Sequence, residues 1–356
     1  MANSINLKIA RESRGFSQKE LSQKTRISQA TLSKIEKGMV RLTDELVTKI
    51  AIALDYPTSF FCRQIASSEN STLFFRKRQS MTAKQLSTLD NKINILSSVI
   101  DEMSDSIDIP PLSIPSLSPN NGVKVEEIAF RLRQYLNVSQ GPIDNIVSLL
   151  EQHGVIVVFL NLGEMEKFDG LTRYTTTNIP VIWINAGMPN DRKRFSLAHE
   201  LGHLVMHLRE DDSLTKSEKE LEEEANLFAG EFLMPTTSCR SDFFNLKYKD
   251  LALKKAYWKV SKAAIIHRAA QLNCINSKTE KYFYITLGRN GERKNEDGVV
   301  SIDEPRMIKK MAQLHLTELE YSMEEFSDLV GLNELEIRTS ILGERIPRFG
   351  KIILNL

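Results

Sequence analysis

The sequence predicts a multidomain protein with four parts: an all-α domain over residues 1–66, a helix and linker over 67–122, an α+β domain over 123–245, and a mainly helical C-terminal region over 246–356. Three observations support this division. A chain of 356 residues is too long for one ordinary core. Short capped helices fill the first sixty residues, whereas β-branched and aromatic runs begin only after residue 123. Between them lies "IDIPPLSIPSLSPNNG" (107–122), which is dense in proline and serine and lacks periodicity.

Composition and charge exclude several classes of protein. A formal net charge of +1 excludes a polycation that binds nucleic acid indiscriminately. The longest apolar runs, such as "GVIVVFL" (154–160), are too short to span a bilayer, and the first residues lack the pattern of a signal peptide. The three cysteines are Cys62, Cys239 and Cys274. Their spacing fits neither a disulfide framework nor a zinc ribbon. We therefore expect a reduced cytoplasmic protein without a membrane partner.

The first sixty residues show repeated helix start and stop signals. Ser17 with Glu20 three residues later forms a capping box, Ser28 caps the next helix, and Gly38 ends it. A further helix follows Thr43, and a last short helix begins at Pro57. The prediction is five small helices in one compact domain.

The next segment carries a heptad pattern. Its apolar residues alternate in spacings of three and four, and they are Leu86, Leu89, Ile93, Leu96, Ile100 and Met103. Two alternatives stay open. The helix forms a dimeric seam, which would make the protein a homodimer, or it packs on its own domain.

Mixed α/β patterns begin at residue 123. Helices are expected at "VEEIAFRLRQYLN" (125–137) and "PIDNIVSLLEQHG" (142–154), and strands at "VIVVFL", "GLTRYTT" and "PVIWINAG". Residues 247–272 and the tail from 304 are again helical, with His267 expected to be structural. "KYFYITLGRNGERK" is expected to form a hairpin around Asn290-Gly291.

The stretch "FSLAHELGHLVMH" (195–207) holds three histidines at four-residue intervals. Residues four apart share one face of a helix, so His199 and His203 present their imidazoles to one point. With Glu200 they form an HExxH pattern. Two such imidazoles hold a zinc ion, and the glutamate takes the proton of the attacking water. We therefore predict a catalytic metal site with Glu200 as its base.

A third protein ligand is expected, because a catalytic zinc takes three and leaves one position open. His207 lies about 12 Å from His199 along a helix axis, too far to share the ion, so we expect it in the core or behind a ligand. The segment "EKELEEEANLFAGEFLMP" (218–235) offers three candidates, Glu222, Glu223 and Glu224. Glu222 is preferred because it stands one turn before Asn226, which would orient a ligand histidine.

"RKRFSLAHELGHLVMH" followed by "EEEANLFAGEFLMP" resembles the ImmA/IrrE family of zinc-dependent endopeptidases, and the similarity runs from about residue 123 to 240. The resemblance implies an α+β thermolysin-like minimal metallopeptidase core. It implies zinc, or else manganese, as the cofactor, with His199, His203 and Glu222 as ligands and Glu200 as catalytic base. It also implies cleavage of transcriptional repressors in stress or mobile-element control. "PVIWINAG" matches the family's edge strand, which would pair with an extended substrate.

Charge is concentrated near the N-terminus. Residues 8–41 contain nine basic and three acidic residues, an excess of six on a nearly neutral chain. Such an excess is typical of a surface that contacts phosphates. A recognition helix also needs exposed side chains that hydrogen-bond to base edges, and the candidates are Gln29, Thr31, Ser33 and Lys34.

Residues 5–61 resemble the Xre/Cro type of helix-turn-helix repressor. The resemblance implies phosphate contacts near Gln18, base contacts from Gln29 to Lys34, and a double-stranded DNA operator. Two residues depart from the pattern. Arg26 stands where many relatives have glycine, with a conformational cost if φ is positive, and Ser22 replaces a small alanine.

Together these features predict a DNA-binding transcriptional regulator with a zinc endopeptidase domain. Its substrate would be a repressor, or the chain itself, cut in the linker between 104 and 122. The alternative is a non-catalytic Xre-type transcription factor or antitoxin-like regulator, in which the metal domain serves as a sensor or scaffold. A helical interaction module remains the alternative for the first domain.

Overall fold

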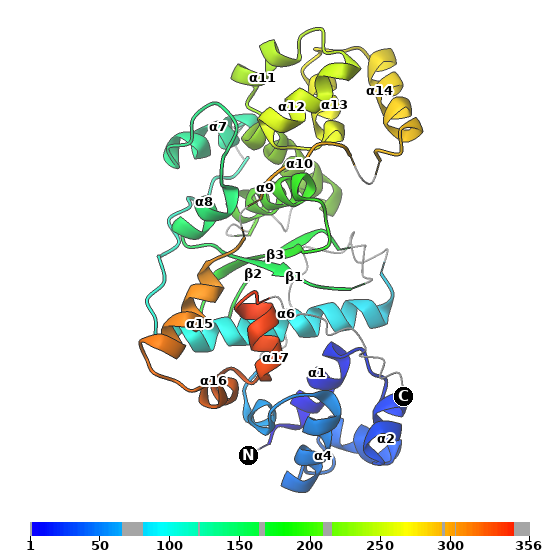
Figure 1. Ribbon diagram of the computed structural model, residues 1–356, viewed down its shortest axis with the longest axis vertical. Coiled ribbons are helices and arrows are strands. Elements are labelled where there is room, and N and C mark those ends of the chain that lie inside the picture. The colour runs from blue at the N-terminus through cyan, green and yellow to red at the C-terminus, as the bar shows by residue number, and fades with distance from the viewer. Residues whose placement is uncertain are drawn as a thin grey trace, which may run out of the picture.

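The computed structural model describes residues 2–65, 81–119, 122–163, 168–208, 216–293, 296–302 and 304–344. The molecule is elongated, with the N-terminal helices at one end, a small sheet in the middle, and helices α11 to α14 at the other end (Figure 1). Among the described residues, no helix is both long and apolar enough to cross a membrane.

The N-terminal helices begin and end at capping residues. They are α1 (Ser4–Ser13), α2 (Gln18–Thr25), α3 (Gln29–Glu36) and α4 (Asp44–Leu54), followed by η1 (Thr58–Cys62). The predicted capping box is present, since the Glu20 N–H donates to Ser17 Oγ and the Ser17 N–H donates to Glu20 Oε2, at 3.2 and 2.6 Å. Helix α2 ends at Arg26, whose φ of 58° is left-handed, so the conformational cost expected at this turn is real.

Helix α6 (Ala83–Ser104) crosses the middle of the molecule and buries its heptad residues within the chain. Leu89, Ile93, Ile100 and Met103 are at most 5% exposed. They pack in one core with α1 and with two C-terminal helices, α15 (Met307–Thr317) and α16 (Met323–Val330). Of the two alternatives for this pattern, packing within the chain is the one found. A homodimer would therefore need a surface other than this seam.

The sheet has three strands, β1 (Ile156–Leu160), β2 (Gly170–Tyr174) and β3 (Pro180–Asn185), in the order β1-β3-β2. Strand β3 runs parallel to β1 and antiparallel to β2. The expectation that "PVIWINAG" forms an edge strand is wrong, because β3 is central. Its six residues are all buried, as a strand covered on both faces requires. The edge beside the HExxH helix belongs to β2.

Helices cover both faces of the sheet (Figure 1). Val181 and Trp183 of β3 face the core that contains α6 and α15, whereas Ile182 and Ile184 face a second core. That second core contains α7 (Val125–Tyr135), α8 (Ile146–Gln152), α9 (Asn190–Met206) and α10 (Glu218–Leu233). The histidine segment thus lies on a helix held directly against the sheet.

The second core continues past residue 245, where a domain boundary was expected. It includes Trp258, Ile265 and Phe283. These residues come from α12 (Leu251–Trp258), α13 (Lys262–Gln271) and α14 (Ser277–Arg289), which follow α11 (Thr236–Phe243) and η4 (Tyr248–Asp250). The C-terminal region is therefore divided between the two cores, because α15 and α16 belong to the first.

The hairpin expected around Asn290-Gly291 is wrong, because residues 277–289 form helix α14. Asn276 caps its start, and Phe283 and Leu287, four residues apart, are both buried. Gly291, with a φ of 73°, lies just past the end, where the Glu292 N–H donates to the Leu287 carbonyl at 2.9 Å. The Asn-Gly pair thus ends a helix here.

The proline-rich linker is partly packed on the second core. Ile114 is 2% exposed, the Ser113 N–H donates to the His153 carbonyl, and the Leu117 N–H donates to the Val205 carbonyl at 2.9 Å. Gly154 faces it so closely that a Cβ would lie 2.6 Å from the Pro111 carbonyl. Residues 111–117 therefore form a strap across the second core.

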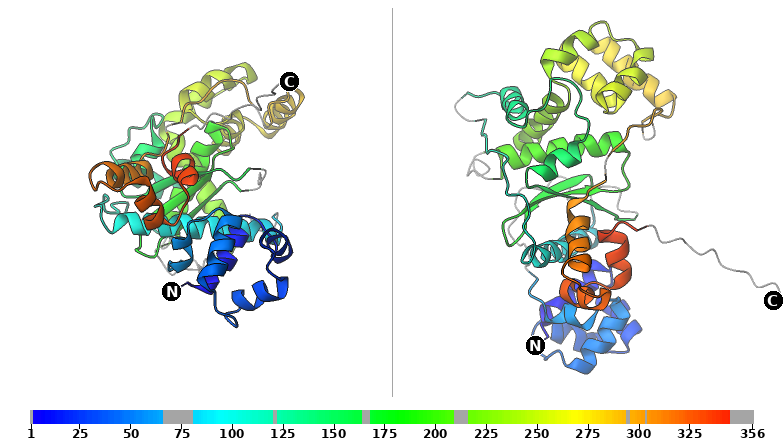
Figure 2. Two further views of the ribbon diagram at one scale, coloured as in Figure 1. Left: turned by 60° about the horizontal axis from the view of Figure 1, so that its bottom comes forward. Right: turned by 60° about the vertical axis from the view of Figure 1, so that its left-hand side comes forward.

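The C-terminal helices also hold the N-terminal domain (Figure 2). The Arg14 guanidinium donates to both carboxylate oxygens of Glu336 at 2.5 and 2.7 Å, and the Asn333 amide donates to the Asp55 carbonyl at 2.8 Å. Glu336 lies in α17 (Glu334–Glu336), which leads into η5 (Ile337–Ile341). The N-terminal domain and the last described helices thus meet beside α6.

Candidate metal centre and nucleic-acid interface

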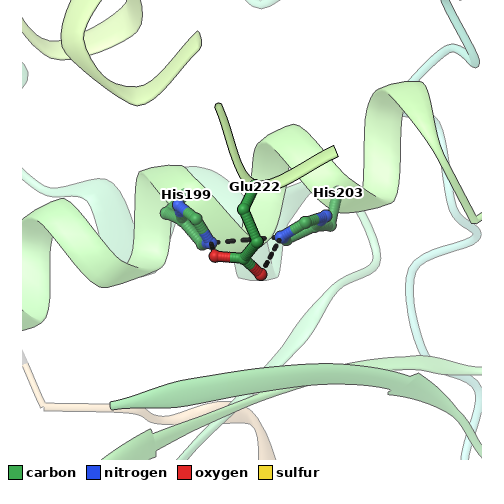
Figure 3. Close-up of side chains that lie close together, drawn as sticks. All are labelled: His199, His203 and Glu222. Carbon is green, nitrogen blue, oxygen red and sulfur yellow. Dashed lines mark hydrogen bonds and ion pairs between the residues drawn. The ribbon is translucent and has the colours of Figure 1, made fainter. Parts of the chain in front are cut away.

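Helices α9 and α10 bring the three predicted ligands together (Figure 3). The Nε2 atoms of His199 and His203 lie 3.1 Å apart. The Glu222 carboxylate reaches over from α10, with Oε2 at 3.5 Å from His199 Nε2 and Oε1 at 3.4 Å from His203 Nε2. The two histidines are 5% and 1% exposed. Two imidazoles and one carboxylate therefore converge at a site with little exposure to solvent.

The spacing of these atoms fits one small cation. Two ligand atoms about 2.0–2.1 Å from a tetrahedral ion lie about 3.3–3.4 Å from each other. The three distances of 3.1, 3.4 and 3.5 Å are close to that value. Two imidazole lone pairs at 3.1 Å repel each other unless a proton or a cation lies between them. The donor set is that of a catalytic zinc site, with three protein ligands.

Each histidine is oriented by its outer nitrogen. Nδ1 of His199 lies 3.1 Å from Oδ1 of Asn226, and Nδ1 of His203 lies 3.0 Å from Nδ1 of His207. Nε2 of His207 in turn lies 2.9 Å from Oε2 of Glu224. One set of tautomers satisfies all three contacts. His199 and His203 carry their protons on Nδ1 and His207 carries its proton on Nε2, so Nε2 of both predicted ligands is unprotonated.

His207 is thus behind a ligand rather than a ligand itself. Burial, together with the neighbouring His203 and Lys216, lowers the pKa of His207 to about 3, so the ring is neutral. A neutral ring is what its contact with Nδ1 of His203 requires, because that contact uses His207 as an acceptor.

The three glutamates of α10 have different surroundings. Glu222 faces the histidines, Glu223 is largely exposed beside Lys219, and Glu224 contacts His207 and Lys216. Glu222 is therefore the carboxylate available to a cation.

Glu200 lies between helix α9 and strand β2. It is 1% exposed, and the hydroxyl of Thr172 lies 3.0 Å from its Oε2. At Gly170 an added Cβ would lie 3.1 Å from Cγ of Glu200 and 2.9 Å from Cδ1 of Ile184, so only glycine fits there without a shift. Sequence patterns did not identify Thr172 or Gly170, since both act through a contact between distant segments.

A cavity of about 320 Å³ is lined in part by Asn226, the residue that contacts Nδ1 of His199. His267, expected to be structural, is exposed on its wall.

The predicted DNA-contacting residues lie on α3 and at the start of α2. Gln29 and Lys34 are exposed, and Ser33 is half-buried. The Thr31 hydroxyl lies 2.8 Å from that of Ser28, and the Gln18 amide donates to Glu36 at 2.9 Å, so these two side chains have contacts within the domain. Gln29, Ser33 and Lys34 form the accessible part of the predicted face.

The basic excess persists at the surface. Arg11 is buried against Glu36, and Arg14 pairs with Glu336. Glu20 is the one exposed acidic residue of this segment. Its other basic residues are all exposed, and they are Lys8, Lys19, Lys24, Arg26, Lys34, Lys37 and Arg41. The internal pairs thus remove as many negative as positive charges, and the exposed positive charge remains.

Comparison with protein families agrees with both halves of this description. Residues 7–61 match the family described as Helix-turn-helix, and residues 150–270 match the family described as IrrE N-terminal-like domain. The chain therefore carries a helix-turn-helix domain followed by a domain of the metallopeptidase type, and the predicted fusion is confirmed. A search of curated proteins found no match.

Proposed function

We propose that this chain, in which a helix-turn-helix domain precedes an IrrE-like domain, is a DNA-binding regulator with zinc-dependent endopeptidase activity. The observation that carries the proposal is the convergence of His199, His203 and Glu222, with the buried Glu200 next to His199 along α9. A scaffold that only held a metal would have no physical need for that fourth group.

The residues divide the work. His199, His203 and Glu222 would hold the ion, and Asn226 and His207 keep the two imidazoles turned toward it. A zinc ion, or manganese, supplies a Lewis acid when bound, which polarises a peptide carbonyl and activates water at neutral pH. Glu200 accepts the proton from the attacking water and passes it to the leaving amine. Thr172 fixes the direction of that carboxylate through its hydroxyl.

The substrate backbone would lie along β2. This strand pairs with β3 on one side and with no other strand among the described residues. Its outer edge at residues 170–172 can pair with an extended peptide. Gly170 and Thr172 face Glu200 from this strand, so a peptide paired there would lie close to the base.

The preferred substrate is another protein, in keeping with the proposed cleavage of a transcriptional repressor in stress or mobile-element control. Self-cleavage within the strap is disfavoured. Its Leu117 is bonded to Val205, which stands two residues after His203 and hence about 200° around the helix, on the side away from the ligands. Among the described residues of the linker, several between 105 and 111 are exposed, and this stretch stays open to cleavage in trans.

Glu200→Gln tests the proposal, because it keeps size and removes the proton acceptor. Wild type and variant would be expressed in the host under DNA damage or prophage-type induction, and new protein N-termini mapped across the proteome. We expect a repressor to be cut by wild type only. General-base assistance is worth about 10²–10⁴-fold in rate, so Glu200→Gln should leave few new termini while zinc content stays unchanged. Identical termini from both proteins would leave the non-catalytic regulator as the function.

A further inference from the structure

A different cavity lies on the α6 face of the sheet, where four distant parts of the chain meet. Its walls include Tyr56 of the helix-turn-helix domain, Ile95 of α6, Val158 of β1, and Leu332 between α16 and α17. Val158 belongs to the first core, whereas the apolar residues of α9 belong to the second. The sheet therefore stands between this cavity and the predicted metal centre (Figure 1).

The cavity is small and largely apolar. Its volume of about 190 Å³ is below the range of about 300–1,000 Å³ for pockets that take drug-sized ligands. The apolar part of the wall is formed by side chains that are at most 5% exposed, and they are Ile95, Val158, Leu160 and Leu332. Thr339 and Ser340 of η5 also line the cavity and are exposed, so this side reaches solvent. The space suits a ligand of few non-hydrogen atoms with a compact apolar group.

Three charged side chains stand on the same wall, and they are Arg14, Lys92 and Glu336. Arg14 and Glu336 satisfy each other, because the guanidinium donates to both carboxylate oxygens. Arg14 also donates to the carbonyls of Leu54 and Asp55, at 2.9 and 2.8 Å. This pair is neutral as a whole, so the charge left on the wall is that of Lys92.

Lys92 lies on α6 and is half-buried. Within the described part of the chain, its ammonium forms neither a hydrogen bond nor an ion pair. The half-buried Lys254 and Lys259, in contrast, contact carboxylates at 2.8 and 2.7 Å. Burial and the nearby Arg14 lower the pKa of Lys92, although Glu336 acts in the opposite direction. An anion in the cavity would give this ammonium a partner and offset the cost of its burial.

We propose that this cavity is a binding site for a small monocarboxylate with a compact apolar group, and that Lys92 holds its carboxylate. One uncompensated ammonium matches one carboxylate, whereas a dianion such as phosphate would bring a second charge without a partner. The apolar group would lie against Val158, Leu160 and Leu332. Because the walls come from both the helix-turn-helix domain and the C-terminal helices, a bound anion stabilises the contact between them. This site would thus regulate how firmly the DNA-binding domain is held, whether or not the chain is a peptidase.

Three small probes test the site by binding. They are 3-methylbutanoate, its uncharged amide 3-methylbutanamide, and acetate. The first two have the same shape and differ in charge, whereas acetate has the charge and lacks the branched group. Dissociation constants would be measured on the full chain by titration, with the NMR signals of each probe as the readout.

3-Methylbutanoate should bind about tenfold or more tightly than its amide, because only the acid pairs with the ammonium. It should also bind about tenfold or more tightly than acetate, because its branched group is buried. Lys92→Met keeps the apolar stem and should abolish the preference for the acid, whereas Lys92→Arg keeps the charge and should retain it. Lys84→Met, an exposed change on the same helix, should bind as wild type does.

Amide hydrogen exchange locates the bound probe. 3-Methylbutanoate should slow exchange in α17 and around Asp55, on either side of the Arg14–Glu336 pair, and the amide should not. Failure of the acid to bind, or equal affinities of acid and amide for wild type, would contradict the proposal without reference to any variant. A preference for the acid that survives in Lys92→Met, as coordination to a metal at His199 would, also contradicts it. The same holds for binding that leaves exchange near Asp55 unchanged.

Discussion

Nδ1 of His207 lies 3.0 Å from Nδ1 of His203, one turn away on the buried face of α9. The contact makes the third histidine of the segment a support for the second. His207 also contacts Glu224 of α10, and Lys216 donates to the same carboxylate. The predicted metal centre is thus connected to Glu224 and Lys216 through His207. Three histidines at equal spacing therefore have two different roles.

The first prediction follows from this difference. His203→Ala should lose the metal, since it removes a ligand. His207→Ala should keep about one zinc per chain with an affinity about 10- to 100-fold lower, the usual effect of removing a group that orients a ligand. Zinc content and competition with a chelator measure both. His153→Ala, whose ring contacts only a backbone carbonyl, is the control. Unchanged affinity in His207→Ala would show that this contact does not support the ligand.

A second prediction concerns the hydroxyl beside the base. Thr172→Val keeps the shape of a fully buried side chain and removes its contact with Glu200. We expect cleavage of the mapped substrate to fall about tenfold or more, because the carboxylate loses its orientation. Zinc content should not change. Thr172→Ser, which keeps the hydroxyl, should restore most of the rate, and equal rates for valine and serine would rule out the positioning role.

DNA binding gives a third prediction. Lys34 is exposed on α3, so Lys34→Ala should lower affinity for duplex DNA and reduce the slope of log affinity against log salt by about one. Gln29→Ala should change sequence preference, measured by selection from a random DNA library, more than it changes the slope. Lys281→Ala, on α14 at the far end of the molecule, should alter neither. An equal slope for all three proteins would remove α3 from the interface.

The contact between the N-terminal domain and α17 gives a fourth prediction. Glu336→Ala removes both hydrogen bonds to Arg14 and should reduce the free energy of unfolding by about 1 kcal/mol, a modest value because the pair is partly exposed. Amide hydrogen exchange should become faster in α16, α17 and around Asp55. Arg338→Ala, which breaks only exposed pairs, is the matched control. Equal exchange in the two variants would mean that the Arg14 pair does not hold the junction.

The two helix glycines give a fifth. Gly202→Ala places a carbon 3.0 Å from Phe228 Cδ1 and should destabilise the protein by about 1–3 kcal/mol through overpacking. Gly230→Ala should be neutral or stabilising by up to about 1 kcal/mol, since alanine is the better helix former. Chemical denaturation of both variants measures the difference. Similar losses in both would indicate that Gly230 is also fixed by packing.

Local patterns in the sequence determined the parts of this protein that depend on neighbours along the chain. The four-residue spacing of His199 and His203 places both on one helix face. The serine caps start α2 and α3, and the β-branched runs form the three strands. These features are set within one or two turns of chain, where side-chain spacing and backbone hydrogen bonds act directly.

Tertiary structure decided which element each segment packs against or pairs with. The heptad residues of α6 meet α1 and α15 instead of a second copy, and β3 is central because it pairs with β1 along one edge and with β2 along the other. Phe283 and Leu287 face the second core, so "KYFYITLG" is helical despite its β-branched and aromatic residues. Among three adjacent glutamates, the angle at which α10 crosses α9 brings Glu222 to the histidines and Glu224 to His207. A sequence records the apolar face of each element, but the partner of that face is fixed only when all elements compete to bury their surfaces in the same core.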